Sequence, residues 1–120
     1  MRNGIAIKTP DDIKIMTEGG KKLASVKKKL MGEVRVGVSA KEIDDLAEKL
    51  IKDSGGYPFL KMVKKYNWTT CININEGVVH GIPKPNMIFK KGDVVSVDVG
   101  MFYKGFHTDY ADTFIIGNVG

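Results

Sequence analysis

Two aspartates near the end of the chain, Asp98 and Asp109, are the residues best suited to chemistry. Asp98 lies within an alternating valine-rich stretch, residues 94–99, where aspartate is depleted and costly to bury without a partner. If Lys104-Gly105 forms a two-residue turn, Asp98 pairs with Ala111, and Asp109 becomes its diagonal neighbour roughly 7–8 Å away. The sequence therefore predicts two like charges on one face of a hairpin.

A divalent cation would neutralise this pair, because carboxylate oxygens are natural ligands for hard and borderline metal ions. The alternative is structural: one aspartate pairs with a lysine and the other is solvated at a sheet edge. His107 shares the face of Asp109, and is either a further ligand or a surface residue. Asp112 has the opposite parity, so we expect it to face away unless a bulge intervenes.

His80 is the second candidate for chemistry. It precedes Gly81, whose missing side chain lets a ligand approach the backbone, and Pro83, which ends a strand. A histidine at this position could hydrogen-bond a substrate amide or transfer a proton near neutral pH. The alternative is a histidine without a chemical role.

Two helices are expected before these residues. Thr9-Pro10-Asp11-Asp12 is typical of a helix start, and the apolar spacing after it predicts a helix over about 10–30. Ser39-Ala40-Lys41-Glu42 is a capping box, which predicts a second helix over about 40–53, before the glycines that follow Ser54. We expect both helices to cover one face of a sheet.

From about residue 68 to 116 the apolar period changes from helical to alternating, and turn residues separate the segments. This pattern predicts an antiparallel meander, and the order of helices then strands indicates an α+β fold in a single domain spanning 1–120. The predicted strands are 69–75, 78–82, 94–103 and 106–116.

Composition narrows the function classes. The 120 residues carry 19 Lys and Arg against 14 Asp and Glu, and Arg2 and Arg35 are the only arginines. Sequence-specific DNA recognition favours arginine, so we expect no specific DNA partner. Dispersed lysine instead gives solubility or weak attraction to anionic surfaces. The lone cysteine, Cys71, rules out an internal disulfide. A single cysteine also fits a reducing compartment, and the sequence shows neither an apolar leader nor an apolar run of membrane length. These features predict a cytoplasmic protein without a membrane partner.

Four ordered blocks give these residues a family context. Together they resemble type I methionine aminopeptidase, in the family's order and at its intervals, and the helical half fits as well. The blocks are Cys71-Ile72-Asn73-Ile74-Asn75-Glu76, Val78-Val79-His80-Gly81-Ile82-Pro83, Gly92-Asp93-Val94-Val95-Ser96-Val97-Asp98-Val99 and Gly105-Phe106-His107-Thr108-Asp109.

The resemblance implies a pita-bread fold and a dinuclear centre of divalent metal (Co, Mn, Fe or Zn) that removes the initiator methionine from nascent peptides. It implies that Asp98 is a chelating ligand, that Asp109 is a bridging ligand, and that His80 contacts the scissile amide. Cys71 and Tyr66 match positions that line the methionine pocket. The alternative for these last two is ordinary core packing.

The chain also departs from the family. The resemblance covers only the first half of the catalytic domain, and the remaining ligands, one histidine and two glutamates, belong to the second half. Residues 61–65 carry more charge than expected around the pocket, and Thr108 replaces a usual glycine. Tyr110 and Asp112 stand where the family has small or neutral residues.

Two functional hypotheses remain. In the first, the chain is a metal-binding half pita-bread unit with little or no aminopeptidase activity as a monomer, completed by a homodimer or by a complementary half. In the second, it is a non-catalytic basic interaction module that uses the lysines around 27–29 to bind the ribosome surface or another acidic partner. Metal titration separates the two.

Overall fold

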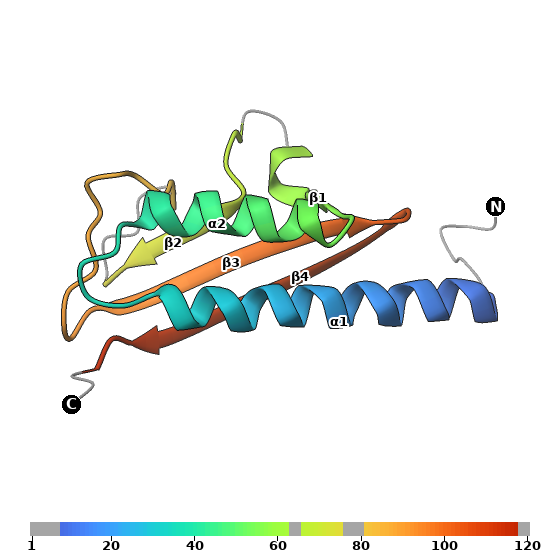
Figure 1. The fold of residues 1–120 in the computed structure, drawn as a ribbon, viewed down its shortest axis with the longest axis horizontal. Coiled ribbons are helices and arrows are strands. Elements are labelled where there is room, and N and C mark those ends of the chain that lie inside the picture. The colour runs from blue at the N-terminus through green and yellow to red at the C-terminus, as the bar shows by residue number, and fades with distance from the viewer. Residues whose placement is uncertain (1–7, 63–65, 76–80, 118–120) are drawn as a thin grey trace.

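A computed structural model describes residues 8–62, 66–75 and 81–117, and shows two helices packed on one face of an antiparallel sheet (Figure 1). Helix α1 (Pro10–Glu33) lies along the last two strands, whereas α2 (Ala40–Asp53) lies against the shorter ones. Within the described ranges, no helix combines the length and apolarity needed to cross a membrane. The predicted arrangement of helices over one face is thus observed.

Both helices begin at the capping boxes that their sequences contain. The Thr9 side chain accepts a hydrogen bond from the Asp12 amide, and the Asp12 carboxylate accepts one from the Thr9 amide. Ser39 and Glu42 make the same reciprocal pair at α2. Helix α1 continues three residues beyond the expected end, because the break falls at Val34, whose extended backbone ends the helical bonding.

The sheet has a long central strand with partners on both sides. β3 pairs with β4 along one edge, and with β2 and the short β1 along the other, always antiparallel. Neither β1 nor the 3-10 helix η1 (Phe59–Met62) that follows it was predicted from the sequence. The strands are β1 (Tyr57–Pro58), β2 (Thr70–Ile74), β3 (Val94–Tyr103) and β4 (Phe106–Ile115).

The predicted meander is wrong in one respect, because β2 lies directly beside β3 instead of being separated from it by a strand at 78–82. Residues 78–80 lie outside the described ranges. The described end of that segment contacts the other edge of β2, where the Ile72 amide donates to the Gly81 carbonyl at 2.7 Å. Connection length explains the order: a long segment between β2 and β3 can cross to the free edge.

The hairpin register agrees with the prediction. Lys104 and Gly105 form the turn with φ of 47° and 90°, which is the left-handed pair that a two-residue hairpin turn uses. Tyr103 pairs with Phe106 and the pairing continues without a bulge. Alternation then sends one face of β3 and β4 toward the helices and leaves the other without a helix.

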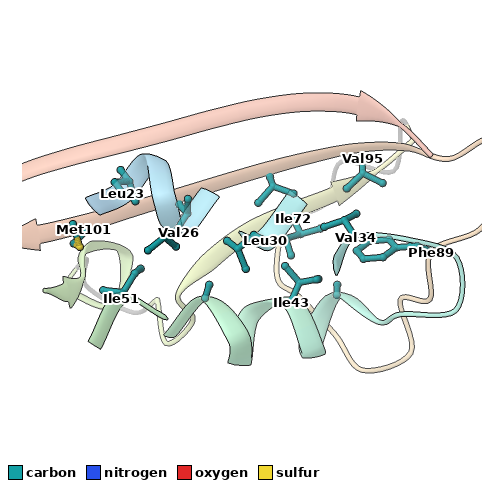
Figure 2. Close-up of a cluster of buried hydrophobic side chains, with 14 of the residues drawn as sticks. Leu23, Val26, Leu30, Val34, Ile43, Ile51, Ile72, Phe89, Val95 and Met101 are labelled. Atoms are coloured by element: carbon teal, nitrogen blue, oxygen red, sulfur yellow. The ribbon is translucent and has the colours of Figure 1, made fainter. Parts of the chain in front are cut away.

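The core lies between the helices and this inner face (Figure 2). Alternate β3 side chains from Val95 to Met101 are buried against it, while Ser96 and Asp98 point the other way. Residues from three parts of the chain fill the space, namely Leu23, Val26 and Leu30 of α1, Ile43, Ala47 and Ile51 of α2, and Ile72, Val95, Val97, Val99 and Met101 of the sheet.

Candidate metal site on the outer face of the hairpin

Asp98 and Asp109 lie on the same outer face of the β3–β4 hairpin. Asp98 pairs with Ala111, and Asp109 pairs with Gly100, so the two aspartates are diagonal neighbours as the register predicted. Gly100 lets Phe59 pack closely against this face, since a Cβ placed there would lie 3.1 Å from Cβ of Phe59. The rigid hairpin therefore fixes the separation of the two carboxylates.

The two carboxylates influence each other electrostatically. The surrounding sheet withdraws water from Asp98, which raises the pKa of its carboxyl, and the charge of Asp109 raises that pKa further. The side chain of Asp109 is 71% exposed. Among the described residues, neither aspartate forms an ion pair with a lysine or arginine, which removes the structural alternative of a lysine partner within those ranges.

His107 shares this face, as expected. Its Nε2 lies 3.9 Å from Oδ2 of Asp109, and its ring stacks on Phe59 with centroids 3.6 Å apart. Stacking fixes the ring beside the carboxylate without bringing it to bonding distance. Within the described ranges, no set of three or more His, Cys, Asp and Glu side chains is grouped closely enough to hold a metal ion.

Asp112 faces the helices, as its parity predicted. Its Oδ2 lies 2.9 Å from Nζ of Lys27 on α1, and the same ammonium group donates to the Tyr110 hydroxyl at 3.3 Å. The Lys27 ammonium also lies over the Tyr110 ring, 4.3 Å from its centroid. The two residues that depart from the family pattern thus share one partner. This three-residue contact, which we call the Lys27 clamp, joins α1 to β4.

Cys71 lies beside the carboxylates on the neighbouring strand, where it pairs with Asp98. Burial raises the pKa of its thiol, and the charge of Asp98 adds to the shift. A depression of about 410 Å³ lies over this part of the sheet, lined on its outer face by Cys71, Asn73, Ser96, Asp98, Ala111 and Thr113. The depression has room for a small side chain next to a carboxylate.

Tyr66 packs beneath this region. Its hydroxyl donates to the Thr70 carbonyl at 2.5 Å and lies 3.3 Å from the Gly81 carbonyl. Burial raises the pKa of this phenol well above its ordinary value. Tyr66 therefore joins the two ends of the segment that contains His80, although His80 itself lies outside the described residues.

Asp44 is an important polar residue that the sequence did not single out. It is 3% exposed, and its Oδ1 accepts hydrogen bonds from the amides of Thr69 and Thr70 at 3.0 and 2.6 Å, and from the Thr70 hydroxyl at 2.6 Å. These bonds attach the start of β2 to α2, one residue before Cys71. An aspartate within the apolar stripe of a helix was the available signal.

Asp98 and Asp109 fit a divalent ion in donor chemistry. Their oxygens are hard donors, they lie on one face of the hairpin, and burial together with the charge of Asp109 raises the pKa of the Asp98 carboxyl, a shift that a bound cation would oppose. They account for two ligands of the four to six or so that such ions take. The donor chemistry of the pair is therefore that of two ligands and not of a complete metal site.

Comparison with known proteins shows the family of the chain. The model of metallopeptidase family M24 matches residues 14–120. Methionine aminopeptidase 1 of Bacillus subtilis is 37% identical over 115 residues, which covers 96% of this chain and 46% of that protein. The methionine aminopeptidase of Clostridium perfringens is 36% identical with the same coverage. The chain thus spans about half the length of these curated relatives.

Solved structures agree on the fold. The crystal structure of methionine aminopeptidase from Thermotoga maritima aligns with a TM-score of 0.87 at 37% identity, covering 97% of this chain and 47% of that one. The prolidase from Pyrococcus horikoshii aligns with a TM-score of 0.76 at 23% identity, a likeness of fold alone. The predicted resemblance and the predicted α+β, half pita-bread fold class are confirmed.

Proposed function

The chain belongs to metallopeptidase family M24, and from this premise we propose that Asp98 and Asp109 bind divalent metal as the first-half ligands of a methionine aminopeptidase centre. The observation that carries the proposal is the pair itself: two carboxylates lie on one face, and neither has a lysine or arginine partner among the described residues. When bound there, the metal supplies a Lewis acid and an activated water for peptide hydrolysis.

The chain's own residues have distinct tasks in this proposal. Asp98 and Asp109 hold the ion, and the hairpin keeps their spacing constant. Cys71 lines the place for a methionine side chain, because it borders the depression beside Asp98. Tyr66 holds the backbone on either side of the His80 segment, and His80 donates to the scissile amide as the family resemblance implies. The substrate class is a peptide with methionine at its N-terminus.

Metal binding is tested by calorimetry with Mn²⁺ or Co²⁺ on the full chain. We expect weak binding that the double variant Asp98→Asn/Asp109→Asn abolishes. Asp112→Asn is the matched control, because this acid lies on the same hairpin but faces α1. Equal heats for the wild type and the double variant would exclude these residues as ligands.

We further propose that the 120-residue chain releases methionine slowly or not at all as a monomer. Two carboxylates leave the position of the ion poorly defined, and catalysis depends on that position. The assay is release of methionine from a Met-Ala-Ser peptide by protein whose monomeric mass has been verified. Turnover at rates comparable to those of full-length family members would overturn this proposal.

The edge of β4 is where we propose that a second copy of the chain binds. Within the described residues β4 pairs only with β3. Phe106–Ile115 contains no lysine, arginine or proline in a chain with 19 Lys and Arg, and it forms no bulge, so its two aspartates are the charges that remain to protect this edge strand. A bound divalent ion would neutralise Asp109. Two-fold pairing at this edge would bring two copies of Asp109 together.

The hairpin register indicates how to test this dimer. Tyr103 and Phe106 flank a two-residue turn and exchange both hydrogen bonds, so odd-numbered β4 residues direct their amides outward. Ala111→Pro therefore removes an outward amide and no bond to β3, whereas Ala111→Val keeps the amide. Light scattering should show a dimer for the wild type and Ala111→Val with Mn²⁺, and a monomer for Ala111→Pro. A wild type that stays monomeric at high concentration with Mn²⁺ would exclude the dimer, and the calorimetry would still report metal binding.

A further inference from the structure

Three lysines form a straight row along the outer face of α1. Lys14, Lys21 and Lys28 are all exposed and recur every seven residues. Seven residues advance a helix by about 10 Å and rotate it by only about 20° relative to two full turns. The row is therefore nearly parallel to the helix axis and about 21 Å long by that rise. It lies opposite the buried side of α1, which contains Gly19, Leu23, Val26 and Leu30.

The lysines of α2 are arranged differently. Lys41, Lys49 and Lys52 each lie within 2.8 Å of a carboxylate oxygen one turn away, on Asp45, Asp53 and Glu48 respectively. Among the described residues, none of the three lysines in the α1 row forms an ion pair. The chain thus neutralises the charge of one helix and leaves that of the other available.

Two acidic residues of α1, Asp11 and Glu18, lie within one turn of Lys14, but neither forms an ion pair with the row among the described residues. Glu18 accepts a hydrogen bond from the Tyr103 hydroxyl at 3.1 Å and so turns toward the sheet. Lys27, which the sequence had grouped with Lys28, turns inward to the clamp with Asp112. That part of the expected lysine face is wrong, because helical rotation places Lys27 about 100° from Lys28. Apart from Glu18, the residues between the lysines on the outer face are small: Thr17, Ala24 and Ser25.

We propose that this row binds the phosphate backbone of nucleic acid without reading sequence. An extended line of exposed positive charges matches an extended polyanion better than a single phosphate group. Lysine acts as a point charge toward phosphate, whereas sequence readout favours arginine, which the row does not contain. A membrane surface fits less well, because insertion requires a continuous exposed apolar face, and the apolar face of α1 is buried against the sheet except for Ile13 and Met16.

Counterion release predicts how this binding depends on salt. Three phosphate contacts give a log–log slope of about −2.7, so affinity should fall about 40-fold between 50 and 200 mM salt. Binding of this kind is weak and serves to hold the protein near an RNA-rich or DNA-rich surface. It uses α1 and not the hairpin, so it is independent of the proposed metal site.

The test measures fluorescence anisotropy of labelled RNA and DNA duplexes of about two helical turns with the full chain. The variant is Lys14→Gln/Lys21→Gln/Lys28→Gln. The matched control is Lys41→Gln/Lys49→Gln/Lys52→Gln, which changes the net charge equally. Circular dichroism verifies folding of both.

We expect the α1 variant to bind at least tenfold more weakly at 50 mM salt with a nearly flat salt dependence, and the α2 variant to stay within about twofold of the wild type. Equal losses in both variants would show a simple effect of net charge and overturn the assignment to the row. No salt-dependent binding by the wild type would also overturn it. Binding to phosphatidylserine vesicles that the α1 variant alone loses, without duplex binding, would make a membrane the partner instead.

Discussion

Replacing Asp44 tests whether one buried carboxylate attaches β2 to α2. Its Oδ1 accepts two backbone amides and one hydroxyl, and the donor residues Thr69 and Thr70 are fully buried. Asp44→Ala removes the acceptor of both amides, and because Thr69 and Thr70 are buried, water cannot replace it. Each unsatisfied buried donor costs about 1–3 kcal/mol, so the free energy of unfolding should fall by about 2–6 kcal/mol.

Asp44→Asn is the milder change, because an amide oxygen can still accept from Thr69 and Thr70. It should cost about 1 kcal/mol, the scale of one net hydrogen bond. The neighbouring acid provides the control. Asp45→Ala removes an exposed carboxylate paired with Lys41 and should change the stability by less than about 0.5 kcal/mol.

The pH dependence has a definite sign. Burial raises the pKa of Asp44 in the folded chain, and the hydrogen bonds from Thr69 and Thr70 offset this shift only in part. In the unfolded chain the carboxyl has its ordinary pKa of about 3.9. As pH rises from below that value through the raised folded pKa, the unfolded state releases its proton first and stability falls. The advantage of the wild type over Asp44→Asn should therefore be largest near pH 4 and shrink toward neutral pH.

The assay is urea unfolding followed by circular dichroism, with midpoint and slope fitted for each variant at several pH values. An Asp44→Ala variant that loses less than about 1 kcal/mol would show that the Thr69 and Thr70 amides find other acceptors. A wild-type advantage that grows with rising pH would refute the raised pKa. The first result would remove Asp44 as the anchor of β2, whereas the second would reverse the sign of its pKa shift and leave the anchor in place.

Three further predictions concern local geometry. Gly81→Ala should lower the melting temperature more than Gly37→Ala, as thermal melts would show. Both glycines have positive φ, but only a Cβ at position 81 would collide with a side chain, 2.0 Å from Sγ of Cys71. Lys27→Met and Asp112→Asn should be non-additive in a double-mutant cycle measured by urea unfolding, since they break the same contact. Lys104→Asn should raise the free energy of unfolding by about 0.5 kcal/mol, because asparagine tolerates the φ of 47° better than lysine; an unchanged or lower midpoint contradicts it.

The hairpin was predictable because it depends on local rules. Lys104-Gly105 fixes the turn, the turn fixes the register, and period-two alternation then assigns Asp98 and Asp109 to one face and Asp112 to the other. Each step needs only neighbouring residues. The helix starts were predictable for the same reason, since a capping box is contained within four residues.

The contacts that the sequence left undetermined join distant segments. Asp44 meets Thr70 across 26 residues, and Lys27 meets Tyr110 across 83. A single sequence shows an aspartate on a helix and a lysine in a run of lysines, and neither pattern specifies a partner. The direct pairing of β2 with β3 was missed for the same reason, because strand order depends on where a long connection crosses.

These two unforeseen contacts act on the proposed site from behind the sheet. Among the described residues no α-helix covers the outer face, where Phe59 of η1 packs against Gly100 and His107. The strands that carry Asp98, Asp109 and Cys71 are therefore held mainly from the inner face. The Lys27 clamp joins α1 to β4, which carries Asp109, and Asp44 joins α2 to β2, which carries Cys71. A substitution at Asp44 that leaves the chain folded should therefore alter the Cys71 side of the depression and preserve the spacing of the two carboxylates. Loss of Lys27 should alter that spacing and preserve the Cys71 side. Metal affinity measured in Lys27→Met and Asp44→Asn separates these effects: it should fall in Lys27→Met and stay at the wild-type value in Asp44→Asn. Wild-type affinity in both variants would show that the hairpin alone sets the geometry.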